Sequence, residues 1–158
     1  MALKNKIDKA LEGVLIVLMG TLVIDVLWQV LSRYILSSPS SFTDELAGFL
    51  LIWVGVLGAA YTVGQKQHLA IDLLLQKSSP KRKNILEIII NLSIALFGLF
   101  VMLVGGSWLV ITRFQFGVTS AALHLPLGYV YLVLPISGLL ITYYSSCFLF
   151  TRSKGGVA

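Results

Sequence analysis

Four long apolar runs constrain this chain more than any other feature of its sequence. They cover residues 11–36, 44–63, 85–112 and 127–150, and together they take up most of the 158 residues. Because a bilayer core about 30 Å thick needs roughly 20 apolar residues per helix, each run is long enough to cross a membrane. The sequence therefore predicts an all-α integral membrane protein, with four transmembrane helices in a single domain, residues 1–158.

The overall composition agrees with that prediction. The chain is 57% hydrophobic and only 12% charged, which differs from the balance of a soluble domain. The first run continues well past the 7–15 apolar residues of a signal peptide, so we expect it to be an uncleaved span. Four spans leave room only for short tails and loops, and this excludes an extramembrane catalytic domain.

The positions of the basic residues predict the orientation of the helices. Ten of the twelve Lys and Arg residues lie before the first run, between the second and third, or after the fourth, and only Arg33 and Arg113 lie on the other side. Because cytoplasmic loops carry an excess of Lys and Arg, both termini and the middle loop are expected in the cytoplasm. The net charge of +5 then reflects topology and contact with membrane lipids, and it does not indicate nucleic-acid binding.

The first run carries a polar stripe. Thr21, Asp25, Gln29 and Arg33 recur every four residues and therefore share one slowly drifting face of a helix. A charge near the membrane centre costs about 2.5–3.5 kcal/mol on insertion scales, so this face is expected to turn away from lipid. It could contact the other helices of this chain, face a partner subunit, or form a proton site, and the sequence leaves these three alternatives open.

Two acids, Asp44 and Glu45, stand at the start of the second run. With Ser41 or Thr43 as a cap, both fall in the first turn of a helix, where the macrodipole favours negative charge by about 0.3–1 kcal/mol. One acid would be enough for this purpose. Capping alone, or capping combined with a role at an interface on the outer side, are both compatible with the pattern.

The second run also carries small residues that allow helices to approach closely in lipid. Gly55 and Ala59 form a small-xxx-small pair, and Gly58 lies between them in sequence. Such patterns are common in membrane helices, so they indicate packing and not one particular function.

The loop between the second and third runs contains HLAIDLLLQ, which is too short to span the membrane. Its polar residues His68, Asp72 and Gln76 are spaced by four, which predicts a short amphipathic segment in the cytoplasmic interface. His68 and Asp72 could share a helical face, but the other histidine, His124, is expected on the opposite side of the membrane. A zinc site is therefore not expected.

No motif in the chain predicts catalysis. There is no phosphate-binding glycine loop after a strand, and no nucleophile has a base beside it. Cys147 is the only cysteine. We expect no enzyme activity, no cofactor and no metal site. A small membrane enzyme would require His68 and His124 on the same side of the membrane.

One proline lies just before the fourth run and another lies within it. Pro126 is expected to open its helix, and Pro135 is expected to kink it.

Four stretches carry a resemblance to a known family. They are WQVLSRY, SSFTDELAGFLLIWVGVLGAAY, QHLAIDLLL and TSAALHLPLGYVYLVLPISG. In this order and spacing the chain resembles the small membrane subunit, of the DctQ or SiaQ type, of tripartite ATP-independent periplasmic (TRAP) transporters. The resemblance covers nearly the whole chain. The recurrent positions of the family correspond here to Arg33, Tyr34, Asp44, Glu45, Trp53, Gly58, His68, Asp72, Ser120, Pro126, Tyr131 and Pro135.

The resemblance implies a supporting role in the bacterial cytoplasmic membrane. The partners would be a large multispan membrane subunit and a periplasmic substrate-binding protein, and the three would import an organic acid such as sialic acid or a C4-dicarboxylate. The large subunit would use the sodium gradient and hold the substrate, and this chain would enlarge its fixed scaffold. The candidate contacts with the large subunit are Asp25, Gln29, Arg33, Trp53, Gly55 and Gly58. Asp44, Glu45 and Ser120 are the candidates on the periplasmic face.

A different class of protein shares the number of spans. Small four-helix multidrug exporters work alone and carry a membrane acid in the first helix, the place that Asp25 takes here. Such exporters are shorter, and an acid that binds cations should have no arginine two turns away, where this chain has Arg33. A self-sufficient, proton-coupled exporter is therefore the alternative interpretation.

Overall fold

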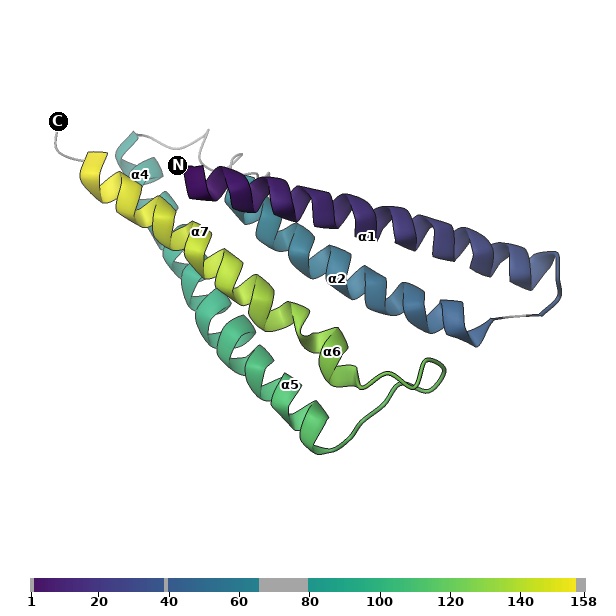
Figure 1. Cartoon of the computed structure of the whole chain (residues 1–158). Coiled ribbons are helices and arrows are strands. Elements are labelled where there is room, and N and C mark those ends of the chain that lie inside the picture. The colour runs from purple at the N-terminus through teal and green to yellow at the C-terminus, as the bar shows by residue number, and fades with distance from the viewer. Residues whose placement is uncertain (1, 39, 66–79, 156–158) are drawn as a thin grey trace. The chain divides into compact units, whose positions relative to one another are not determined.

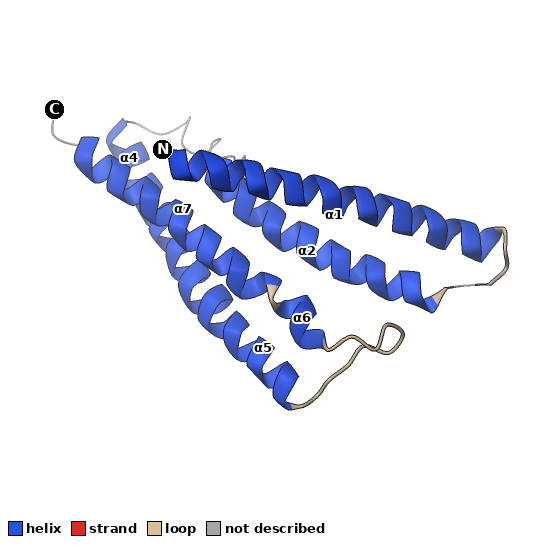
Figure 2. Cartoon of the chain, in the orientation of Figure 1, coloured by secondary structure: helices blue, strands red, loops and turns tan. Residues whose placement is uncertain are grey.

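The structure, a computed structural model, describes residues 2–38, 40–65 and 80–155 as helices joined by short connections (Figure 1). The helices are α1 (Ala2–Tyr34), α2 (Ser41–Gln65), α4 (Pro80–Leu96), η1 (Phe97–Gly105), α5 (Gly106–Gln115), α6 (Leu127–Tyr131) and α7 (Val133–Gly155). Within the described ranges Figure 2 shows helices and loops and no strand, although an isolated bridge pairs Thr119 with Pro126.

Among the described residues, four segments are long and apolar enough to cross a membrane: Lys4–Tyr34, Ser41–Gln65, Ile85–Gln115 and Leu127–Phe148. The predicted all-α fold with four spans is confirmed. The boundaries differ by up to several residues, because the first helix begins earlier and the second begins at Ser41. The amphipathic segment with His68 and Asp72 lies outside the described residues.

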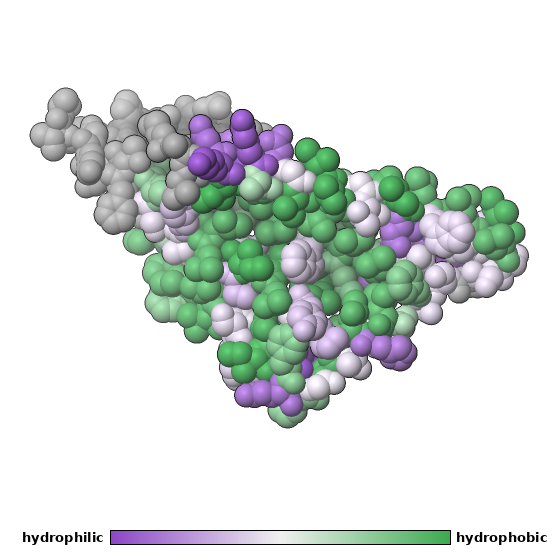
Figure 3. Space-filling view, in the orientation of Figure 1, coloured by the Kyte–Doolittle hydropathy of each residue, from purple (hydrophilic) through white to green (hydrophobic). Residues whose placement is uncertain are grey.

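Apolar side chains cover much of the surface of these spans. Figure 3 shows hydrophobic residues over most of the visible face. On α1, Ile24 is 71% exposed and Val17 is 68% exposed. Exposure of this apolar surface to water would be unfavourable, whereas lipid or another membrane protein can cover it without cost.

The described chain divides into two compact units. The first unit comprises residues up to Gly58 together with Trp108–Val133, and the second comprises Ala59–Ser107 together with residues from Leu134 onward. The helices α2, α5 and α7 each begin or end in one unit and continue into the other. The prediction of one domain over residues 1–158 stays a prediction.

The third membrane span contains a π-helical stretch, η1, which lies in the second unit. This span runs as α4, η1 and α5 without a break, because the residues at both ends of η1, Leu96 and Gly106, have ordinary helical dihedral angles. Nine residues make η1 unusually long, since π-helices mostly occur as single turns within α-helices. The sequence analysis did not predict this feature.

Glycines allow η1 to lie against α7 within the second unit. A Cβ on Gly138 would lie 2.7 Å from the backbone nitrogen of Leu103 and 2.8 Å from the carbonyl oxygen of Gly98. A Cβ on Gly98 would lie 2.9 Å from Ile141. The two backbones are therefore in direct contact, and any larger residue at these positions would force them apart.

The fourth span is broken where the prolines predict it. Pro126 precedes the first residue of α6, and the break between α6 and α7 falls at Leu132, three residues before Pro135. Proline at position 135 has no N–H to donate to the carbonyl of Tyr131 and crowds that turn, which separates the two helices there. The prediction that Pro126 opens the helix is confirmed, and where Pro135 was expected to kink the helix the structure has a break at Leu132.

Candidate functional site

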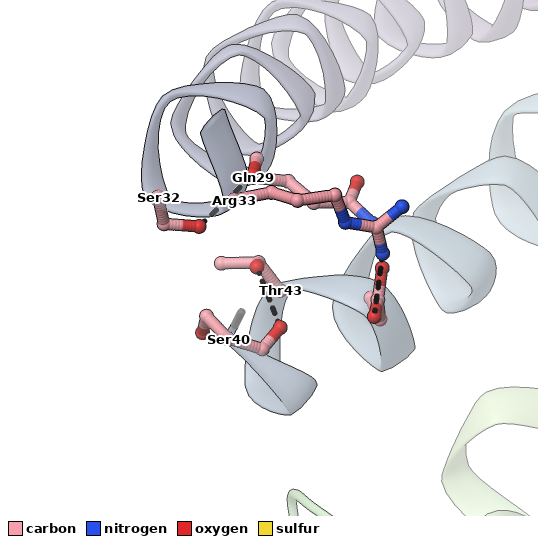
Figure 4. A network of polar contacts seen from close by, with 6 residues as sticks. Gln29, Ser32, Arg33, Ser40 and Thr43 are labelled. Atoms are coloured by element: carbon pink, nitrogen blue, oxygen red, sulfur yellow. Dashed lines mark hydrogen bonds and ion pairs between the residues drawn. The ribbon is translucent and has the colours of Figure 1, made fainter. Parts of the chain in front are cut away.

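The polar groups of the first unit gather where α1 ends and α2 begins. Arg33, in the last turn of α1, forms an ion pair with Asp44 in the first turn of α2, with 3.6 Å between Nη2 and Oδ2 (Figure 4). Both side chains are about half exposed. Arg33 lies at the C-terminus of α1 and Asp44 at the N-terminus of α2, so each charge also interacts favourably with the dipole of its own helix. The pair joins the first two spans across their short connection.

The start of α2 is organised by hydroxyl groups, although not as a side-chain cap. Thr43 is buried, and its hydroxyl donates to the carbonyl oxygen of Ser40 at 3.0 Å. Ser32 makes the corresponding bond to the carbonyl oxygen of Gln29 at 2.9 Å (Figure 4). These hydroxyls satisfy carbonyl groups, whereas the expected cap would have accepted from a free N–H group. The helix begins at Ser41, earlier than a cap at Ser41 or Thr43 requires, so the expected cap is not found at either residue.

Asp25 and Gln29 lie further along the same face of α1. Asp25 is buried, at 7% exposed, and its Oδ2 atom has no hydrogen-bond partner among the described residues. Gln29 is half-buried. Asp25 and Gln29 are thus turned toward this chain's own residues, whereas Thr21 and Arg33 at the two ends of the same stripe are exposed. Contact of Asp25, Gln29 or Arg33 with another subunit stays a prediction.

Glu45 holds the second outer connection. Its carboxylate accepts three consecutive backbone N–H groups, from Ala121 at 3.0 Å and from Ala122 and Leu123 at 2.8 Å each. Three backbone donors on one carboxylate make a charge-assisted anion site built from a loop backbone. Of the two acids only Asp44 lies in the first turn of α2, so the prediction that both lie there is wrong for Glu45. The Glu45 carboxylate instead shapes a loop about 76 residues away.

The loop itself, residues 116–126, is closed by further backbone bonds. Ser120 donates its N–H to the carbonyl of Leu125 at 2.9 Å, and its hydroxyl accepts from the N–H of Leu125 at 3.2 Å. His124 between them has a positive φ of 53°, which is uncommon for a residue with a side chain. The Glu45 carboxylate and these bonds give the loop one defined conformation.

Trp53 forms a hydrogen bond next to the break in the fourth span. Its Nε1–H donates to the backbone carbonyl of Val130 at 3.0 Å. Val130 lies just before the interruption at Leu132, where the regular helical bonds stop. A carbonyl left free at a helix end needs a donor, and the indole supplies it from α2.

Gly55 and Gly58 have open space on the side where a side chain would project. A Cβ on either would meet no atom within 4 Å, and Gly55 is exposed. Of the six predicted interface residues, Arg33 and Trp53 are engaged within the chain, whereas Gly55 presents an open surface.

The second unit contains a groove of about 500 Å³. Its lining residues are Ala59, Thr62, Val63, Ser93, Ile94, Phe97 and Ile141. None of them is charged. A site for an organic acid would need cationic or converging donor groups, so this groove is unsuited to hold the carboxylate of such a molecule. Across the described ranges, no three His, Cys, Asp or Glu side chains are placed to hold a metal ion.

Comparison with known proteins adds the family. The family model for the DctQ component of tripartite ATP-independent periplasmic transporters matches residues 22–155. The chain belongs to this family. The resemblance found in the sequence is confirmed, and so is the expectation that the chain is not an enzyme, because the DctQ family consists of transporter components.

Three relatives show how far the similarity extends. A putative TRAP transporter small permease protein of Haemophilus influenzae is 31% identical over 143 residues, which are 89% of this chain and 86% of that protein. The C4-dicarboxylate TRAP transporter small permease protein DctQ of Rhodobacter capsulatus is 30% identical over 118 residues, 74% of this chain and 49% of that protein. The sialic acid TRAP transporter permease protein SiaT of Haemophilus influenzae is 38% identical over 71 residues, 44% of this chain and 11% of that protein.

Family and fold together establish the general role. The chain is a small TRAP permease subunit of a tripartite transporter for organic acids, and it works with a large permease subunit and a periplasmic binding protein. Its four apolar spans make it a multi-pass protein of the bacterial inner membrane. The contacts of Glu45 with the loop and of Trp53 with Val130 were missed by sequence reasoning, because no local pattern links residues some 76 positions apart.

Proposed function

We propose that this DctQ-family subunit is a fixed scaffold for the large membrane subunit and holds no substrate itself. The observation that carries the proposal is the use made of its polar groups. Arg33 pairs with Asp44, and Glu45 holds the outer loop. Arg33, Asp44 and Glu45 at the outer end are thus engaged in contacts within the subunit itself, and the described residues of its groove carry no charge that could hold an organic acid.

The relatives support a partner in the membrane. The stretch similar to this chain is only 11% of the SiaT permease protein, so in that protein it belongs to a much longer polypeptide. A small subunit that is fused to a larger one in a relative is expected to bind that larger one when the two are separate. We propose the same association for this chain.

The proposed contact surface includes the open face of α2. Gly48 and Gly55 are exposed, and a Cβ on either meets nothing within 4 Å. Together with Ala59 they lie on one face of the helix. Small residues in lipid favour close approach of another helix, and lipid tails gain little from such a surface. A helix of the large subunit is the proposed occupant.

The proposed transport reaction is sodium-driven import of an organic acid. The sodium and substrate sites are assigned to the large subunit. Relatives named for C4-dicarboxylate and for sialic acid leave the acid open, and sialic acid is one candidate. The periplasmic binding protein would deliver the acid at the end of the subunit that carries Asp44, Glu45 and Ser120.

Reconstitution tests the scaffold. Proteoliposomes containing the large subunit, with or without this chain, are given the loaded binding protein and an inward sodium gradient. Uptake is expected only when both membrane subunits are present. Full uptake by the large subunit alone would refute the scaffold role. Export of lipophilic cations by this chain alone, lost in Asp25→Asn, would favour the exporter instead.

Substitution of one glycine tests the contact surface. Gly55→Leu should weaken co-purification of the large subunit, because the added side chain fills the space that a helix would occupy. Gly20→Leu is the matched control, since Gly20 is exposed on α1 and also has open space around it. Equal retention of the large subunit by both variants would exclude Gly55 from the interface.

A further inference from the structure

Arg113 is a permanently charged side chain for which the proposed function has no role. It lies in the last turn of α5 and is half-buried. Its Nε atom is buried and has no hydrogen-bond partner among the described residues. Among the described residues, the ion pairs join Lys4 with Asp8 and Arg33 with Asp44. No carboxylate in the described ranges therefore forms an ion pair with Arg113.

The surroundings fix the position of this guanidinium. Its Cζ lies 5.8 Å from the centre of the Tyr131 ring, which is a cation–π contact within the first unit. The neighbouring Phe114 packs edge-on against Tyr129, with 5.1 Å between ring centres, and a Cβ on Gly128 would lie 2.5 Å from the Phe114 ring. The end of α5 is thus packed closely on α6, and Arg113 is held on one side by an aromatic face.

The backbone at the end of α5 does not use the guanidinium. Gly117, with φ of 58°, donates its N–H to the carbonyl of Phe114, and Val118 donates to the carbonyl of Arg113. This pair of bonds is a Schellman motif, which satisfies two of the last carbonyls by itself. The donors of Arg113 are left for another acceptor, and an unpaired half-buried charge is costly.

The position of Arg113 in the membrane indicates the acceptor. Three aromatic side chains at this end of the third and fourth spans are strongly exposed: Trp108 at 74%, Phe116 at 76% and Tyr129 at 57%. Exposed aromatic residues near the ends of spans are typical of the level of the lipid headgroups. Lipid phosphates lie at this level, and they match the forked donors of arginine.

We propose that Arg113 binds the phosphate of a phospholipid headgroup in the leaflet at this end of the spans, the periplasmic leaflet according to the charge distribution. The ring of Tyr131 supports the guanidinium from behind, and the exposed aromatic residues border the lipid. The residues of this lipid site, on α5 and α6, are different from those of the α2 face assigned to the large subunit.

Binding of phosphatidylglycerol to the full-length purified chain tests the site. The chain is stripped of lipid in detergent, and bound lipid is measured by native mass spectrometry alongside the midpoint of thermal unfolding. Loss of one charge-assisted bidentate contact in Arg113→Gln should weaken binding about tenfold or more. Arg113→Lys should be intermediate, because lysine binds phosphate only as a point charge. Arg82→Gln is the control, since Arg82 is exposed at the other end of the third span.

The arms of the experiment separate the possible acceptors. The wild-type chain should be stabilised by phosphatidylglycerol and not by a phosphate-free glycolipid, a comparison that needs no variant. Equal stabilisation by both lipids, or equal lipid binding by Arg113→Gln and the wild type, would overturn the proposal. Inorganic phosphate that replaces the lipid at millimolar concentration would overturn the lipid assignment. If Arg113→Gln binds lipid as the wild type does but no longer co-purifies with the large subunit, the acceptor is a carboxylate of that subunit. This outcome would also overturn the lipid proposal.

Discussion

The two compact units of this subunit are stabilised by different kinds of contact. In the first unit, polar groups join segments far apart in sequence, as Glu45 does with the outer loop and Trp53 with Val130. In the second unit, backbones touch at glycines, as Gly138 does with Gly98. The first unit's contacts each join α2 to the stretch that connects the third and fourth spans or opens the fourth, whereas the glycine contacts lie in the middle of the third and fourth spans. In hydrocarbon, close packing stabilises a helix pair without burying polar side chains.

The largest expected effect comes from breaking the glycine contact. In Gly138→Ala the new Cβ would lie 2.7–3.0 Å from three backbone atoms, which cannot move as a flexible side chain could. We expect a loss of about 1–3 kcal/mol in the free energy of unfolding, as for other overpacked sites. Thermal unfolding in detergent measures it. Gly55→Ala is the control, because its Cβ meets no atom. Equal midpoints for the two variants would show that η1 and α7 are not in backbone contact.

The next effect comes from removing the acceptor in the first unit. Glu45→Ala leaves the N–H groups of Ala121, Ala122 and Leu123 without their acceptor. Their hydrogen exchange should become several-fold faster, because the loop loses the group that closes it. Glu45→Gln keeps one carbonyl oxygen and should be intermediate. Glu12→Ala, at an exposed position on α1, should leave the loop unchanged. Unaltered hydrogen exchange of these three N–H groups in Glu45→Ala would show that the Glu45 carboxylate does not hold the loop.

A smaller effect is expected from one indole hydrogen bond. Trp53→Phe removes the donor to the carbonyl of Val130 and keeps most of the ring volume. The expected loss of stability is about 1 kcal/mol, the usual net value of one hydrogen bond. Trp28→Phe is the control, since Trp28 is 54% exposed on α1. If both variants unfold at the same temperature, the Trp53 bond contributes nothing measurable.

The smallest effect belongs to the exposed ion pair. Asp44→Asn and Arg33→Gln should each cost about 0.2–1 kcal/mol, because both partners are about half exposed to solvent. A double-mutant cycle isolates the coupling, which should shrink as the salt concentration rises. A coupling as large as the effect of Gly138→Ala, or one indifferent to salt, would mean that the contrast between the two units is wrong.

Local signals predicted much of the fold. Apolar runs fixed the number of spans, Pro126 and Pro135 fixed where the fourth span begins and breaks, and the acids after Ser41 marked the start of the second helix. Each of these features depends on a residue and its near neighbours in sequence. Such effects are the same in almost any fold.

The candidate site was predicted less well. The sequence singled out Glu45 and Ser120 as residues of the outer face, but it did not predict that Glu45 accepts the three backbone N–H groups that follow Ser120. It gave Trp53 an interface role and did not foresee its bond to Val130. It did not foresee η1 either, since an apolar run shows no difference between α- and π-helical turns.

The sequence by itself determined that this chain lies in a membrane as four helices, because burial of backbone groups in lipid permits little else to so apolar a chain. Only the tertiary structure decided which polar groups meet. Glu45 reaches the loop, and Gly138 touches Gly98, because folding brings together residues that are distant in sequence. Those contacts depend on the shape of the neighbouring helix, which no single segment encodes.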